Sequence, residues 1–154
     1  MEGLPGQRHV YSHAGKTVYE WDQSLSEVNI YVEVPQGVRA KQLTVSIKPQ
    51  HLSVGIKDLP AYLDKELGGL VRVSESLWTL EDGVLHIQLA KAQADTTWAS
   101  AIAGHELRAD QQQEDQKRLL LERFQQEHPG FDFSSAEFSG GEVPDPRTFL
   151  RDQS

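Results

Sequence analysis

The chain of 154 residues carries 15 Lys and Arg against 23 Asp and Glu, a formal net charge of −8, and it contains no cysteine. This balance makes it a poor candidate for binding nucleic acid or acidic membranes, which require clustered Lys and Arg, and the lack of cysteine excludes disulfides and thiolate chemistry. The length fits one domain with appendages, and with neither a leader pattern nor an apolar run of membrane-spanning length we expect a soluble, cytoplasmic protein.

Residues 1–15 are rich in glycine and show no hydrophobic period. Such a stretch is typical of a flexible N-terminal lead. If this lead docks on the folded domain, we expect the docking to occur late and to use its large side chains Val10 and Tyr11.

Residues 16–91 contain several short segments in which apolar and polar side chains alternate, among them residues 28–34, 43–47 and 52–56. Successive side chains of a strand point to opposite faces, so this alternation predicts strands with one buried face and one solvated face. Turn residues separate the segments and no helical period intervenes, which favours an all-β antiparallel β-sandwich over a parallel sheet. The predicted inward-facing core residues are Val28, Ile30, Val32, Val45, Val54, Trp78, Leu80, Leu85 and Ile87.

The clearest hairpin is predicted over residues 78–90. Asp82-Gly83 separates two alternating runs there, and an Asp-Gly pair suits the two positive φ angles of a type I′ turn. Trp78 lies just before the turn on the inward face, where its ring would be the largest apolar group of the core.

The alternation stops after Lys91. Residues 92–109 begin as a polar stretch and then contain the apolar side chains of Trp98, Ile102 and Leu107. We expect this segment to fold back on the sandwich through Trp98.

Residues 110–128 are rich in Gln, Glu, Lys, Arg and Leu, which favour a helix. Asp110 is the expected N-cap, with Gln113 completing a variant of the capping box, and Pro129-Gly130 ends the helix. The apolar stripe of this helix is narrow, so packing on the sandwich, pairing with a second copy and partial freedom all stay open. The stripe consists of Leu120, Leu121 and Phe124.

Residues 129–154 are rich in Gly, Ser, Asp and Pro and predict a mobile tail. Phe131 and Phe133 would point the same way in an extended chain, with Phe138 nearby, and exposed phenylalanines are costly in water. We therefore predict a docking segment here. It either straps onto its own sandwich, which we favour, or recognises a partner.

No catalytic or metal-binding pattern is recognisable in the sequence. The six histidines lie singly, and His105-Glu106 lacks the second histidine of a zinc site. The sequence also lacks a glycine-rich phosphate loop and a nucleophile elbow. We expect no enzymatic activity, no cofactor and no metal, and an enzyme that assembles its site from distant residues is the alternative.

Exposed aromatic side chains are the best candidates for binding another protein. Tyr31 should face outward because Ile30 and Val32 face inward. Tyr19 and Trp21 share one face of the first strand, and either they are exposed or they pack beneath the lead and the fold-back segment. The predicted partner-binding residues are Tyr19, Trp21, Tyr31, Phe131, Phe133 and Phe138.

Six stretches between residues 19 and 138 occur in an order that resembles the NudC family and its CS domain. They are residues 19–28 (YEWDQSLSEV), 34–38 (VPQGV), 67–70 (LGGL), 75–83 (ESLWTLEDG), 121–125 (LERFQ) and 129–134 (PGFDFS). The resemblance implies a compact sandwich of seven or eight strands, similar to the small heat-shock fold, with a C-terminal helical extension.

The resemblance also implies a co-chaperone without enzymatic activity. Members of this family bind unfolded or maturing client proteins without ATP and assist heat-shock protein 90, and their clients include β-propeller proteins and the dynein-regulating machinery of nuclear movement. The coiled-coil extension of NudC itself has no counterpart in this sequence, so the oligomeric state stays open. The alternative from another functional class is a passive adaptor that docks one folded partner.

Overall fold

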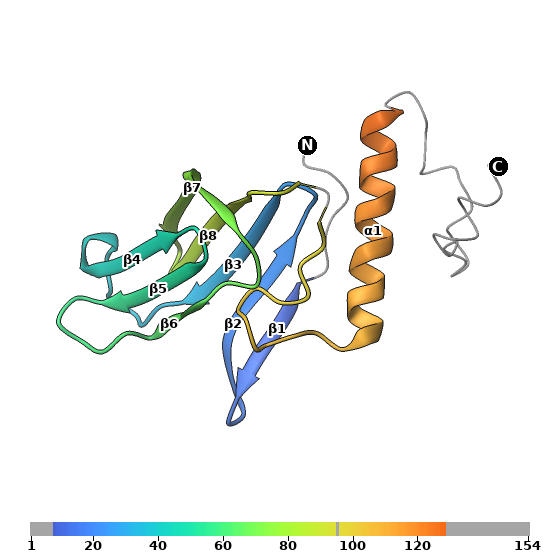
Figure 1. Cartoon of the computed structure of the whole chain (residues 1–154). Helices are drawn as coiled ribbons and strands as arrows, with labels where there is room; N and C mark the ends of the chain where they lie inside the picture. Colours follow the sequence, from blue (N-terminus) through green and yellow to red (C-terminus); the bar gives the residue numbers. More distant parts are fainter. Residues whose placement is uncertain (1–7, 95, 129–154) are drawn as a thin grey trace.

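The computed structural model describes residues 8–94 and 96–128, which form two β-sheets and a C-terminal helix (Figure 1). One sheet has five strands in the order β1-β2-β3-β8-β7, the other has three in the order β4-β5-β6, and all pairings are antiparallel. The elements are β1 (His9–His13), β2 (Lys16–Gln23), β3 (Glu27–Glu33), η1 (Ala40–Gln42), β4 (Leu43–Lys48), β5 (His51–Ile56), β6 (Leu63–Glu66), β7 (Val71–Glu81), β8 (Val84–Lys91) and α1 (Ala109–Glu127). The predicted fold class, a β-sandwich with a C-terminal helix, is confirmed.

The core lies between the two sheets and is built from the alternating positions of the central strands. Val28, Ile30 and Val32 of β3 are buried, and Leu85 and Ile87 of β8 pair beside them. The central strands therefore follow the predicted alternation. The three-stranded sheet contributes Leu43, Leu52, Val54 and Leu63.

Three side chains on two edge strands are less buried than predicted. Trp78 and Leu80 of β7, and Val45 of β4, are only half-buried, although all three pack against the core. Both strands end their sheets, so a neighbour covers each of them on one side only. The fully buried tryptophan of the core is Trp21 of β2, and the prediction that Trp78 is the largest apolar group of the core is wrong.

The N-terminal stretch is not a lead up to residue 15. His9–His13 form β1, which pairs with β2 through a tight hairpin. Ala14 and Gly15 have φ angles of 54° and 80° in this turn, the two positive values that a type I′ turn needs. The free edge of β2 is thus closed by five residues that show no hydrophobic period.

Two turn predictions agree with the structure. Asp82 and Gly83 have φ angles of 52° and 77°, as the β7–β8 hairpin requires. Gly68-Gly69 joins β6 to β7, and it also lets the chain approach the fold-back segment closely. A Cβ atom on Gly69 would lie 2.5 Å from the Trp98 ring, and Trp98 is buried as expected.

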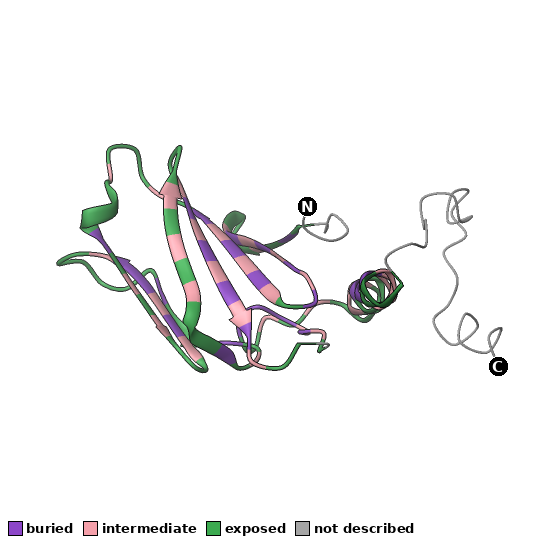
Figure 2. Cartoon of the chain, turned by 90° about the horizontal axis from the view of Figure 1, so that it is seen from above, coloured by how far each residue is buried: buried purple, intermediate pink, exposed green. Residues whose placement is uncertain are grey.

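Helix α1 stands beside the β1 side of the sandwich (Figure 1). Its N-cap is Arg108, whose backbone N–H donates to the Gln111 side chain at 3.2 Å, so the predicted cap at Asp110 is displaced by two residues. Seen end-on, the buried residues of the helix lie on the side of the sheets (Figure 2). These residues are Asp115, Leu119 and Glu122.

The predicted apolar stripe of α1 is not the side that contacts the sandwich. Leu120, Leu121 and Phe124 are half-buried, and at 100° per residue they lie on the side opposite Asp115. Of the open alternatives, the structure shows the helix packed on the sandwich, but through the side that carries Asp115, Leu119 and Glu122 and not through the apolar stripe.

Candidate partner-binding site

Tyr19 and Trp21 are core residues. Their exposed fractions are 1% and 2%. The Tyr19 hydroxyl lies 2.7 Å from Nδ1 of His105, and the Trp21 ring lies 5.0 Å from the His9 ring. Both pack beneath β1 and the fold-back segment, so the prediction that they bind a partner is wrong.

Tyr31 lies on the outer face of the five-stranded sheet, as expected, and is half-buried there. Its ring stacks on His86 at 4.7 Å, and its hydroxyl donates to Asp22 at 3.1 Å. Asn29 donates to the same carboxylate at 2.9 Å, and its side-chain oxygen lies 2.9 Å from Nε2 of His86. We call these four residues, Asp22, Asn29, Tyr31 and His86, the outer-face cluster.

The electrostatics keep the cluster's ring groups uncharged at neutral pH. Burial raises the pKa of the Tyr31 phenol, and Asp22 raises it further. Burial lowers the pKa of His86. A neutral phenol ring presents a negative π-face, which attracts cations.

The guanidinium group of Arg8 lies over that face of the Tyr31 ring. Its guanidinium carbon lies 3.6 Å from the Tyr31 ring centroid, and its Nη1 lies 3.4 Å from a Glu20 carboxylate oxygen. The side chains of Arg8 and Glu20 are 50% and 39% exposed, so water competes for both groups. Ion pairs this exposed contribute little to stability.

A hollow of about 150 Å³ lies beside Tyr31. Glu20, Glu33 and Tyr62 line it together with Tyr31. Tyr62 is fixed by a hydrogen bond from its hydroxyl to the Val18 carbonyl oxygen, at 2.7 Å. We call this hollow the acidic hollow.

A larger groove of about 380 Å³ adjoins the acidic hollow at Glu33 and Tyr62, which line both. It is mostly apolar, and we call it the end groove. Tyr62 is 52% exposed, and Leu59 in the same β5–β6 connection is 61% exposed. The apolar side chains that line it are Val32, Val34, Pro35, Leu43, Val54, Ile56 and Tyr62.

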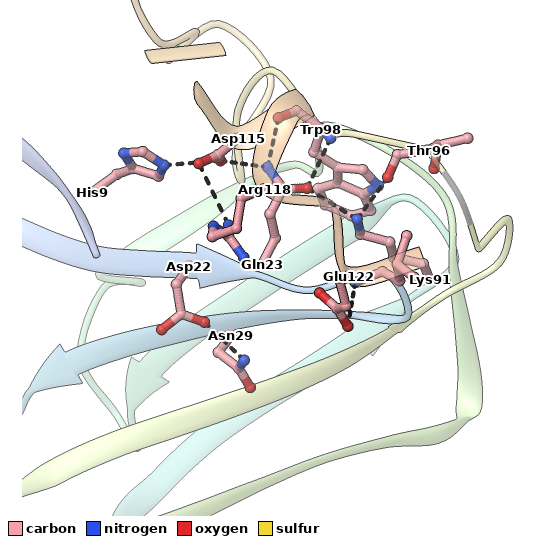
Figure 3. A network of polar contacts seen from close by, with 11 residues as sticks. His9, Asp22, Gln23, Asn29, Lys91, Thr96, Trp98, Asp115, Arg118 and Glu122 are labelled. Carbon is pink, nitrogen blue, oxygen red and sulfur yellow. Dashed lines mark hydrogen bonds and ion pairs between the residues drawn. The ribbon is translucent and has the colours of Figure 1, made fainter. Parts of the chain in front are cut away.

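A second polar network lies under α1 and is closed to partners (Figure 3). Asp115 of α1 lies 2.9 Å from Nε2 of His9 and accepts a hydrogen bond from Gln23 at 2.9 Å. Lys91 donates to Gln23 at 2.9 Å, and Gln23 also bonds both backbone polar groups of Trp98. We call this set of five residues the buried network.

Burial alone would raise the pKa of Asp115, but the hydrogen bonds from His9 and Gln23 outweigh it and hold that pKa below its usual value. Burial lowers the pKa of Lys91 to about 8. The buried network thus holds α1 on the sandwich largely through polar groups.

The remaining predicted site residues, Phe131, Phe133 and Phe138, lie outside the described residues. Sequence reasoning missed Arg8, Glu33 and Tyr62, because nothing local indicates that Arg8 reaches the Tyr31 ring or that Glu33 and Tyr62 line the same two hollows. Within residues 8–94 and 96–128, no three His, Asp or Glu side chains gather as metal ligands. The one helix of that part is too polar to cross a membrane.

Comparison with known proteins places this sandwich among its relatives. The CS domain family matches residues 17–91. NudC domain-containing protein 2 of Homo sapiens is 41% identical over 128 residues, which cover 79% of each chain. Nuclear movement protein nudc of Schizosaccharomyces pombe is 31% identical over 151 residues, covering 76% of this chain and 91% of that one. The solution structure of the CS domain of human KIAA1068 protein superposes with a TM-score of 0.54 at 25% identity, over 69% of this chain and 90% of that one.

Proposed function

Because the chain belongs to the NudC family of CS-domain proteins, we propose that it is an ATP-independent co-chaperone in the cytoplasm. It binds unfolded or maturing client proteins and assists heat-shock protein 90. Its clients belong to the machinery of nuclear movement, such as dynein regulators, and include β-propeller proteins. Its relatives include nuclear movement proteins, which supports this setting.

The end groove is the observation that carries the proposal. Its lining is mostly apolar, Tyr62 on its wall is exposed to solvent, and the exposed Leu59 lies three residues earlier in the same β5–β6 connection. An unfolded client exposes apolar side chains, and each one covered contributes about 1.5–3 kcal/mol before the costs of ordering are subtracted. Such binding needs no hydrolysis and no catalytic residue.

The test is suppression of the aggregation of a heat-labile client, followed by light scattering without ATP. We expect suppression at stoichiometric ratios. A Leu59→Ser/Tyr62→Ser variant should suppress several-fold less well, while the control Val73→Ser/Leu77→Ser, at two apolar positions exposed elsewhere, should act like the unmodified protein. Both variants must keep their melting temperature for the comparison to hold.

The outer-face cluster favours a second candidate, the passive adaptor. Its side chains are already fixed by stacking and hydrogen bonds, as suits the docking of one folded partner. If scattering is unaffected even by an excess of the protein, this candidate replaces the first.

A further inference from the structure

We propose that the acidic hollow anchors an arginine or lysine side chain of the bound partner, next to the apolar residues that occupy the end groove. In the free protein, Arg8 contacts the same anchoring groups and competes with the partner. This inference rests on the proposed partner-binding function and names the chemistry of the segment that is bound.

The chemistry of the hollow fits a guanidinium group. A guanidinium is planar, stacks on aromatic faces and pairs with carboxylates. The hollow offers the Tyr31 ring and the carboxylates of Glu20 and Glu33. Arg8 does not line the hollow, but it contacts two of these groups, at 3.6 Å from the Tyr31 ring centroid and 3.4 Å from Glu20. Two of the lining residues therefore already bind a cation.

The contact of Arg8 is exchangeable. Its side chain and that of Glu20 are both substantially exposed, and such pairs are weak and screened by salt. Glu33 is exposed, and it forms no ion pair with any residue that the structure describes. An incoming cation therefore gains one carboxylate that Arg8 does not use.

The position of the hollow defines the rest of the segment. Glu33 and Tyr62 line both the acidic hollow and the end groove, so one extended peptide can fill the two together. The partner is then a segment in which several apolar residues lie next to an Arg or Lys. The net charge of −8 favours approach of such a segment.

The test uses the full chain and two labelled eight-residue peptides, one with three apolar residues next to an arginine and a twin with glutamine instead. By fluorescence anisotropy we expect the arginine peptide to bind about tenfold more tightly, with a preference that falls as salt is raised. Arg8→Ala should tighten its binding about threefold. Glu20→Gln/Glu33→Gln should abolish the preference for arginine.

The control Glu27→Gln/Glu75→Gln removes the same charge elsewhere and should keep the preference. Equal binding of the two peptides by both the unmodified protein and Arg8→Ala overturns the inference, and so does a preference that survives Glu20→Gln/Glu33→Gln. The aggregation assay is run on the same samples. Suppression of aggregation without arginine preference rejects this inference alone, whereas arginine preference without suppression rejects the chaperone function and leaves the anchor in place.

Discussion

The outer-face cluster and the buried network contain the same kinds of side chains, but the two sets have different roles. Each places a histidine close to an amide or carboxylate oxygen: His86 with Asn29 on the outside, His9 with Asp115 under the helix. The side chains of His9 and Asp115 are 8% and 4% exposed, whereas the residues of the outer-face cluster are only half-buried. Contacts in the buried network stabilise the fold, whereas contacts on the outer face can be replaced by contacts with a partner. This difference comes from access to water and not from residue type.

The energetic reason is desolvation. A buried polar group that loses its partner cannot turn to water and keeps the full cost of its burial. A surface group that loses its partner is solvated again at little cost. The same kind of substitution should therefore have unequal effects in the two regions.

The largest difference is expected for the aromatic residues. Trp21→Ala removes a fully buried ring and should lower the free energy of unfolding by about 3–5 kcal/mol. Tyr31→Ala, on the outer face, should lower it by about 1 kcal/mol. Denaturant titrations of both variants measure the contrast, and equal losses would show that Tyr31 belongs to the core after all.

The next largest difference concerns the carboxylates. Asp115→Ala removes the carboxylate beside Nε2 of His9 and an acceptor of Gln23, and we expect the free energy of unfolding to fall by about 2–3 kcal/mol together with weaker docking of α1. Asp22→Ala on the outer face should cost less than about 1 kcal/mol. Unfolding titrations give the energies, and hydrogen exchange in α1 reports the docking. Unchanged exchange in Asp115→Ala would mean that the helix is held by other contacts.

The smallest effect is a pH dependence from Lys91. Its pKa in the folded chain is about 8, below the ordinary value of 10.5, mainly because of burial. Above pH 8 the unfolded chain keeps a proton that the folded chain has lost, so the free energy of unfolding should rise with pH, by on the order of 1 kcal/mol between pH 7.5 and 9.5. Burial raises the pKa of Tyr19. Above about pH 10 the unfolded chain therefore loses the phenol proton first, and Tyr19 lowers the free energy of unfolding as the pH rises.

Unfolding titrations across this pH range test the effect. Lys91→Gln should lack the rise, and Lys48→Gln, at an exposed position, should keep it. Identical slopes for the two variants would contradict a deprotonation of Lys91 in the folded chain.

The local sequence pattern was sufficient to predict the central strands and the Asp82-Gly83 hairpin, because alternation and turn type depend on residues that are neighbours in the chain. The local pattern was not sufficient to predict that Tyr19 and Trp21 are buried. Alternation shows that two side chains share a face, but only the pairing with β1 and the packing of the fold-back segment show which face is inward.

The docking side of α1 could not be predicted for a related reason. An apolar stripe is the usual sign of a buried helix face, and here that stripe points away from the sandwich. The side that docks carries Asp115 and Glu122. His9, Gln23 and Leu25, about a hundred residues away in the chain, supply partners for these two carboxylates, and Arg118 of the same helix lies 3.5 Å from Asp115.

The contact between His9 and Asp115 has a consequence for synthesis. The two residues are 106 positions apart in the chain. At a synthesis rate of about 5–20 residues per second, Asp115 is added roughly 5–20 s after His9. During that time Gln23 and Lys91 lack the helix that covers them. A chain that terminates before α1 would keep Gln23 without its Asp115 partner, so an unfinished product differs from a complete one in its exposed polar surface.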